Sequence, residues 1–182
     1  MKARRMSAVA ISSTVVAGAA LVPGAASAAE WSFGLDDWEN LQISNKGRIT
    51  AKFADSGRIK STVAPVGTIT LKGSSQGLYK AGKLKAPDTL TVQDKITFDG
   101  AGISVASAGT GGFTVSGGLT KKTFTWKRSG KKALNFGHAF SGLQVRGTIL
   151  RVTHQVTTTA RTGSSDSDVT ATDTCRFADC HF

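Results

Sequence analysis

The sequence predicts an all-β protein, a single-domain antiparallel β-sandwich or barrel of roughly 9–11 short strands, preceded by a cleaved signal peptide. Three observations favour this class. Apolar and polar residues alternate over most of the chain, turn residues recur about every ten residues, and segments with helical periodicity are nearly absent. Valine, isoleucine, threonine and phenylalanine supply the β propensity.

The first half of the chain contains three expected turns. Alternation from Leu41 to Phe53 surrounds a turn at 45–47, a turn at Asp55-Ser56-Gly57 leads into Ile59–Val63, and Pro65-Val66-Gly67 precedes Ile69–Leu71. The one helical candidate is Leu35–Leu41, where Asp36, Asp37 and Glu39 suit a first turn.

The second half continues the pattern. Strands are expected around Leu90–Val92, Ile96–Phe98, Ile103–Val105, Phe113–Val115, Phe124–Trp126 and Leu143–Thr159, the last with a register slip at Gly147. Turns are expected at Asp99-Gly100, at the glycine-rich loop Gly109–Gly112 and at the tip Arg128–Lys131. The polar stretch Ala160–Thr174 is interpreted as a loop followed by an edge strand.

Residues 1–28 have the organisation of a secretory signal peptide. Lys2, Arg4 and Arg5 form a basic start, an uncharged apolar run follows, and Ala26-Ser27-Ala28 supplies small residues for cleavage. The apolar run is too short for a stable membrane-spanning helix. We therefore expect a secreted, extracellular bacterial protein whose mature part, 29–182, is one β domain.

The expected mature chain is strongly basic. Residues 1–28 hold three of the 23 basic residues and none of the 12 acidic ones, which leaves a formal net charge of +8. A basic exported protein is attracted to polyanions such as teichoic acids, acidic polysaccharides and anionic lipid head groups. Positive charge that serves only solubility is the alternative.

Cys175 and Cys180 are the two cysteines of the chain. In an oxidising compartment such a pair is first interpreted as a disulfide, which here would staple the C-terminal tail. Their spacing matches no familiar zinc site, and no metal or cofactor is expected.

The best candidate binding site is a basic hairpin with interleaved aromatic residues. Phe124, Trp126 and Lys122 fall on one strand face, so exposure of that face would make a stacking platform flanked by cations. If the face points to the core, only a charged tip remains. The candidate binding residues are Lys121, Lys122, Phe124, Trp126, Lys127, Arg128, Lys131 and Lys132.

Three other motifs are weaker. Gly73–Gly77 matches the G-x-S-x-G pattern of serine hydrolases, with His138 and His154 downstream, but no strand-to-helix turn is expected there. Gly77–Lys83 resembles the start of a phosphate-binding loop without its hydroxyl residue or helix, so no dedicated nucleotide is expected. His154 is in register with core positions, whereas His138 is expected in a loop.

These observations predict a non-catalytic secreted protein that binds an anionic cell-envelope or extracellular polymer. One alternative is a membrane-active, pore-forming protein that inserts the uncharged hairpin Gly100–Gly118. The other is an inhibitor of an extracellular enzyme such as a protease, presenting the Cys175–Cys180 loop or the Gly137–Gly142 loop.

Overall fold

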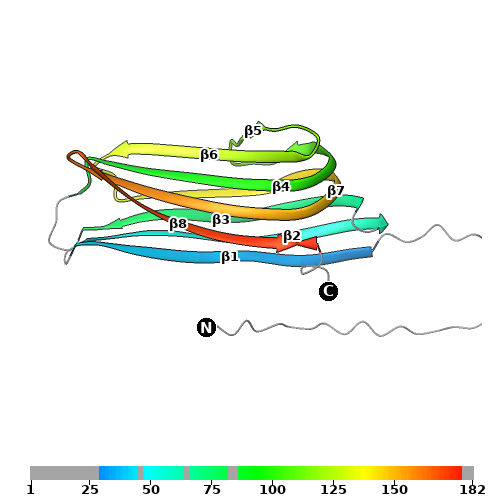
Figure 1. The fold of residues 1–182 in the computed structure, drawn as a ribbon, viewed down its shortest axis with the longest axis horizontal. Helices are drawn as coiled ribbons and strands as arrows, with labels where there is room; N and C mark the ends of the chain where they lie inside the picture. Colours follow the sequence, from blue (N-terminus) through cyan, green and yellow to red (C-terminus); the bar gives the residue numbers. More distant parts are fainter. Residues whose placement is uncertain (1–28, 45–46, 64–65, 82–85, 178–182) are drawn as a thin grey trace, which may run out of the picture.

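The computed structural model describes residues 29–44, 47–63, 66–81 and 86–177. These residues form eight antiparallel strands joined in one sheet (Figure 1), so the all-β prediction is confirmed. The strands are β1 (Ala29–Ser44), β2 (Gly47–Val63), β3 (Val66–Lys80), β4 (Thr89–Ala108), β5 (Thr114–Ser116), β6 (Lys121–Lys131), β7 (Asn135–Thr162) and β8 (Ser165–Arg176).

The sheet folds over so that two layers face each other. Its strand order is β1-β2-β3-β7-β4-β6-β5, with β8 paired to β7. Residues 135–148 of β7 pair with β3, residues 143–161 pair with β4, and residues 151–162 pair with β8. β7 therefore belongs to both layers, and it curves with β4 at one end of the molecule (Figure 1). Gly142 and Gly147, both at positive φ, lie within this strand.

β1 and β8 are edge strands of the two layers, and contacts between them join the layers along these edges. The backbone N–H of Thr172 donates to the Asp37 carboxylate at 2.8 Å, and the N–H of Asp36 donates to the Asp173 carboxylate at 3.2 Å. Carboxylates of each strand thus accept from the backbone of the other, which satisfies donors that a sheet edge leaves without ladder partners.

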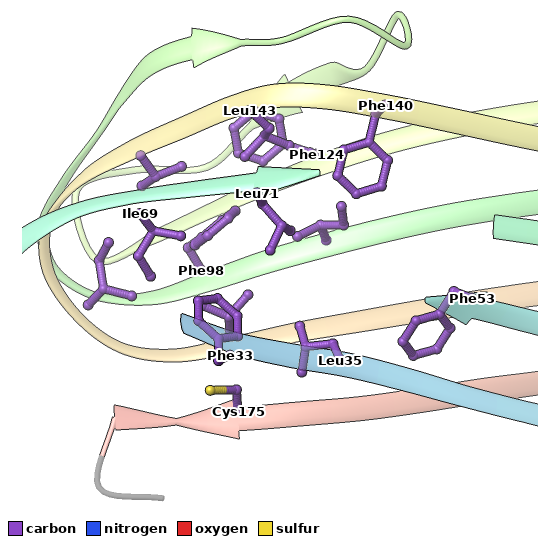
Figure 2. Close-up of a cluster of buried hydrophobic side chains, with 14 of the residues drawn as sticks. Phe33, Leu35, Phe53, Ile69, Leu71, Phe98, Phe124, Phe140, Leu143 and Cys175 are labelled. Carbon is purple, nitrogen blue, oxygen red and sulfur yellow. The ribbon is translucent and has the colours of Figure 1, made fainter. Parts of the chain in front are cut away.

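The core lies between the layers. Side chains from several strands converge there (Figure 2), and the fully buried residues include Leu35, Leu71, Phe98, Phe124 and Leu143. A second cluster, formed by Ile49, Tyr79, Leu90 and Ala160, lies at another part of the same interior. Alternating inward residues on every long strand produce this arrangement.

The strands are longer and fewer than the sequence predicts. The expected turns at Asp55–Gly57 and Asp99–Gly100 lie inside β2 and β4, and the G-x-S-x-G segment lies inside β3. At Gly57 and Gly73 the absence of a side chain lets groups of the neighbouring strand lie close to the backbone. A side chain at Gly57 would overlap the Phe33 ring, and one at Gly73 would overlap the Asp55 carboxylate.

Other local predictions are also corrected. Leu35–Leu41 is part of β1 and no helix, because its neighbours on β2 provide ladder partners. Within Ala160–Thr174 only residues 163–164 lie outside strands, and Arg128–Lys131 belongs to β6. The loop at Gly109–Gly112 is confirmed, as is a register irregularity beside Gly147. The expected leader 1–28, the turn residues 45–46 and 64–65, and Cys180 lie outside the described residues.

We expect Gly57→Ala to lower the free energy of unfolding by about 1–3 kcal/mol, because the new methyl group displaces the buried Phe33 ring. Gly34→Ala is the matched control. Its Cβ would meet only a backbone oxygen at 3.7 Å, and we expect a change within about 1 kcal/mol. Urea unfolding followed by circular dichroism measures both variants, and equal losses would contradict the packing role assigned to Gly57.

Candidate functional site

A chain of buried polar side chains joins the two layers. Its centre is Asp94 on β4, whose side chain is completely buried. One carboxylate oxygen, Oδ2, accepts from the Ser75 hydroxyl at 2.7 Å and from His138 Nδ1 at 2.7 Å. The other oxygen, Oδ1, accepts from His154 Nε2 at 2.7 Å. Four side chains from β3, β4 and the two halves of β7 are thereby linked.

His154 extends the chain to a second carboxylate. Its Nδ1 lies 2.6 Å from Oδ2 of Asp55 on β2, and both side chains are completely buried. The other oxygen of Asp55, Oδ1, is buried with no hydrogen-bond partner among the described residues. We call the five residues Asp55, Ser75, Asp94, His138 and His154 the buried polar chain.

Aromatic rings enclose both imidazoles. The Trp126 ring stacks on His138 with 4.3 Å between centroids, and the Phe53 ring lies 4.1 Å from that of His154. The second nitrogen of His138, Nε2, lies 2.9 Å from the Gly111 carbonyl oxygen. Both nitrogens of His138 therefore lie within hydrogen-bond distance of an oxygen atom.

The hydrogen bonds separate the pKa values of these groups. Burial alone raises the pKa of Asp94, but hydrogen bonds from His138 and His154 outweigh it and lower that pKa to about 2. Burial alone lowers the pKa of His154, yet its bonds to Asp55 and Asp94 raise it to about 9. Burial raises the pKa of Asp55, with His154 opposing the shift. An ionised Asp94 and a protonated His154 are thus paired near neutral pH.

This geometry does not suit nucleophilic catalysis. A serine nucleophile needs a base within hydrogen-bond reach, but the Ser75 hydroxyl donates to Asp94, and the same carboxylate occupies one nitrogen of each histidine. Ser75 also lies within a strand and is buried. Over residues 29–44, 47–63, 66–81 and 86–177, no group of three or more histidine, cysteine or acidic residues is arranged to hold a metal ion.

The predicted basic hairpin is only partly available for binding. Lys121, Lys127, Arg128, Lys131 and Lys132 are exposed, whereas Lys122 is half-buried and its amine donates to the Gly117 carbonyl oxygen at 2.9 Å. The Arg128 guanidinium lies over the Phe136 ring, 5.2 Å from its centroid. The strand therefore carries exposed cations along one face and near its end.

The aromatic residues of the basic hairpin pack in or against the core. Phe124 is fully buried, and Trp126 is half-buried, packs against the core and stacks on His138. Lys122, Phe124 and Trp126 share one face, as alternation predicts, and that face points inward because its partners on β4 are Phe98, Ile96 and Asp94. The proposed stacking platform is thus wrong for Phe124, which offers no surface to a ligand.

A second basic surface lies on the outside of the other layer. β2, β3 and β7 contain one acidic residue, Asp55, and its side chain points inward. Exposed cations from these strands occur along the outer side without an acidic neighbour on the same strands. We call this surface the basic face, formed by Arg48, Lys52, Arg58, Lys60, Lys72, Lys80 and Arg146.

The ladder places two of these cations directly opposite each other. Arg48 of β2 is directly opposite Lys80 of β3, a like-charge pair that costs stability unless an anion or solvent screens it. At the β1 margin, Glu30 lies 3.4 Å from Arg58 and partly offsets its charge. The rest of the face, around Lys52, Lys72 and Arg146, has no ion pair of 4.0 Å or less among the described side chains.

A shallow pocket of about 470 Å³ is hollowed into this face. Nine residues line it, three consecutive residues from each of β2, β3 and β7: Lys52, Phe53, Ala54, Ser74, Ser75, Gln76, Gly137, His138 and Ala139. The small outward residues Ala54, Gly137 and Ala139 create the hollow, and Lys52, Ser74 and Gln76 supply polar groups around it.

The segments proposed for membrane insertion and for enzyme inhibition contribute residues to the sheet and the core. Ile103 of the Gly100–Gly118 segment is fully buried, and Phe113 packs against the core. Gly137–Gly142 belongs to β7 and is no loop. Cys175 is buried at the end of β8. Its expected partner Cys180 is outside the described residues, so the disulfide stays a prediction.

Sequence reasoning missed the buried polar chain and the basic face. The register of His154 with Val152 and Val156 correctly predicts a buried, hydrogen-bonded histidine. His138 is on a strand and not in a loop. The usable signal for Asp94 was its alternation with Val92 and Ile96, which places a carboxylate at a core position.

No model of a known protein family matches the chain, and no curated protein is similar to it. None of the helical structure in the described part of the chain is long and apolar enough to cross a membrane.

We expect Asp94→Asn to lower the free energy of unfolding by about 3–5 kcal/mol, because it removes the charge between two buried imidazoles. Asp99→Asn is the control on the same strand. Its partner Arg151 is half-exposed, and we expect a loss below about 1 kcal/mol. Urea unfolding measures both variants. If Asp94→Asn loses no more than about 1 kcal/mol, the buried polar chain contributes little to the free energy of unfolding.

Stability should also fall between about pH 6.5 and pH 9. The pKa of His154 is raised from 6.5 to about 9, so its stabilising contribution is complete below pH 6.5 and is lost as the pH rises through 9. The expected loss is up to about 3 kcal/mol. Urea unfolding across this range tests it, and NMR of the imidazole nitrogens identifies the titrating group. A His154 ring that titrates near pH 6.5 would contradict the assignment.

Proposed function

We propose that this protein is a secreted, non-catalytic binding module whose basic face engages an anionic polymer of the cell envelope or the extracellular space. The observation that carries the proposal is the separation of charge on the sheet. Seven exposed cations gather on the outer side of β2, β3 and β7, and the single acidic side chain of those strands is buried. A surface on which positive charge predominates attracts ligands of negative charge.

Three further points support the proposal. The basic start, apolar run and A-x-A site of residues 1–28 are typical of export. The hydrogen bonds of Ser75, His138 and His154 occupy the groups that a hydrolase would need. The apolar residues Ile103 and Phe113 are used in the core, which disfavours insertion of the Gly100–Gly118 hairpin into a membrane.

The first experiment is co-sedimentation of the mature protein with bacterial cell-wall sacculi over a salt series. We expect binding at low salt that weakens steeply as salt rises, because each neutralised anionic group releases counterions. Binding to neither sacculi nor soluble polyanions at low salt would overturn the function. Release of dye from anionic liposomes would support the membrane-active alternative instead.

Two charge-reversed variants then locate the site. The triple variant Lys52→Glu, Lys72→Glu and Arg146→Glu changes the basic face, and we expect it to lose at least about tenfold in affinity. The variant Lys127→Glu, Lys131→Glu and Lys132→Glu makes the same change in net charge on the hairpin. It should stay within about threefold of the wild type. The reverse order would move the binding site to the hairpin.

A further inference from the structure

We infer that the shallow pocket on the basic face is a subsite for one sugar ring of an acidic polysaccharide, with Trp38 stacking beside it. This inference rests on the proposed function and narrows it from polyanions in general to polymers of anionic sugars. It follows from what surrounds the pocket, which combines cations, neutral hydrogen-bonding groups and one exposed aromatic ring.

The sheet register places Trp38 next to the pocket. Trp38 of β1 is directly opposite Lys52 of β2, and Lys52 is opposite Gln76 of β3, which is opposite Gly137 of β7. Residues paired across a ladder share a face and lie about 5 Å apart at Cβ. Lys52 and Gln76 line the pocket, so Trp38 lies one strand beyond the lining residues, paired with Lys52 and on the same outer face.

The exposure of Trp38 sets it apart from the other aromatic residues that the structure describes. Its side chain is 54% exposed, whereas Trp31 and Trp126 pack against the core. An exposed indole offers a flat apolar surface on which the apolar face of a ring can stack. Because it is one ring and not a row, it suits one stacked unit at this place in the polymer.

The groups around the pocket suit a hydroxylated, negatively charged ring. The Gln76 amide and the Ser74 hydroxyl donate and accept hydrogen bonds, as a sugar with several hydroxyls requires. Lys52 at the pocket and Lys72, two residues from Ser74 on the same face, supply positive charge. Asp36, which is opposite Ala54, repels an anion on the β1 side and directs the charged group toward the lysines.

The floor of the pocket explains how a ring approaches the sheet. Ala54, Gly137 and Ala139 have no long side chain, so a ligand reaches the backbone of three adjacent strands. Ser75 and His138 also line the pocket, and their side chains are held in place by hydrogen bonds to the buried Asp94. A preformed site of this kind avoids part of the ordering cost of binding.

The test compares a polymer of sugar carboxylates with a polymer of carboxylates that has no sugar. Polygalacturonate and polyglutamate are titrated against the mature protein by calorimetry at low salt. We expect Trp38→Ala to weaken polygalacturonate binding at least about tenfold and to leave polyglutamate binding within about twofold. Trp38→Phe should retain most of the affinity because it keeps an aromatic ring. Leu150→Ala, which removes another exposed apolar side chain at 53% exposure, should change neither affinity.

A second variant tests the pocket itself. Ser74→Tyr places a bulky side chain in the hollow at an exposed strand position, and we expect it to reduce polygalacturonate binding selectively. If both variants bind polygalacturonate as the wild type does, the sugar subsite is wrong while the polyanion function stands. If Trp38→Ala instead weakens binding of single-stranded DNA alone, the ring that stacks is a base, which also overturns the inference. If the wild-type protein binds none of polygalacturonate, polyglutamate and single-stranded DNA, the proposed function itself is refuted.

Discussion

The buried charge of Asp94 is the constraint on which the rest of the structure depends. Its carboxylate lies on β4, and its partners Ser75 and His138 belong to the opposite layer, while His154 passes a further bond across to Asp55. A buried ion with one partner removed is strongly unfavourable, so any slip of one layer against the other is penalised. Apolar contacts alone tolerate such slips far better, because they have little directional preference.

Close packing between strands and between layers explains why several glycines lie inside strands. Asp55 needs space opposite Gly73, and a side chain at Gly77 would collide with Val92 and Thr158 of the other layer. On the outer side of β2, β3 and β7, the small residues Ala54, Gly137 and Ala139 leave a hollow. The inner side of this part of the sheet is therefore rigid and polar, and its outer side is open and flanked by cations. A binding surface gains from such support, because its groups are held in place before a ligand arrives.

Much of the fold was predictable from local pattern. Alternation around Phe98, Phe124 and Leu143 correctly identifies inward positions, because successive side chains on a strand point to opposite faces. The number of strands was not predictable in the same way. Asp55-Ser56-Gly57 and Asp99-Gly100 have the composition of turns, but long neighbouring strands supply ladder partners on both sides and hold them extended. Tertiary pairing overrode local preference at these positions.

The sequence by itself determined that the chain is all-β, that its charge is strongly positive, and that its histidine at position 154 faces a core. Only the tertiary structure decided which residues meet. Ser75 and Asp94 are 19 positions apart, and Asp55 and His154 are 99 apart, yet each pair is joined by one hydrogen bond. The cations of the basic face come from β2, β3 and β7, and Trp38 comes from β1. Strand order and register bring these positions together, and both depend on long-range pairing that no local stretch of sequence encodes.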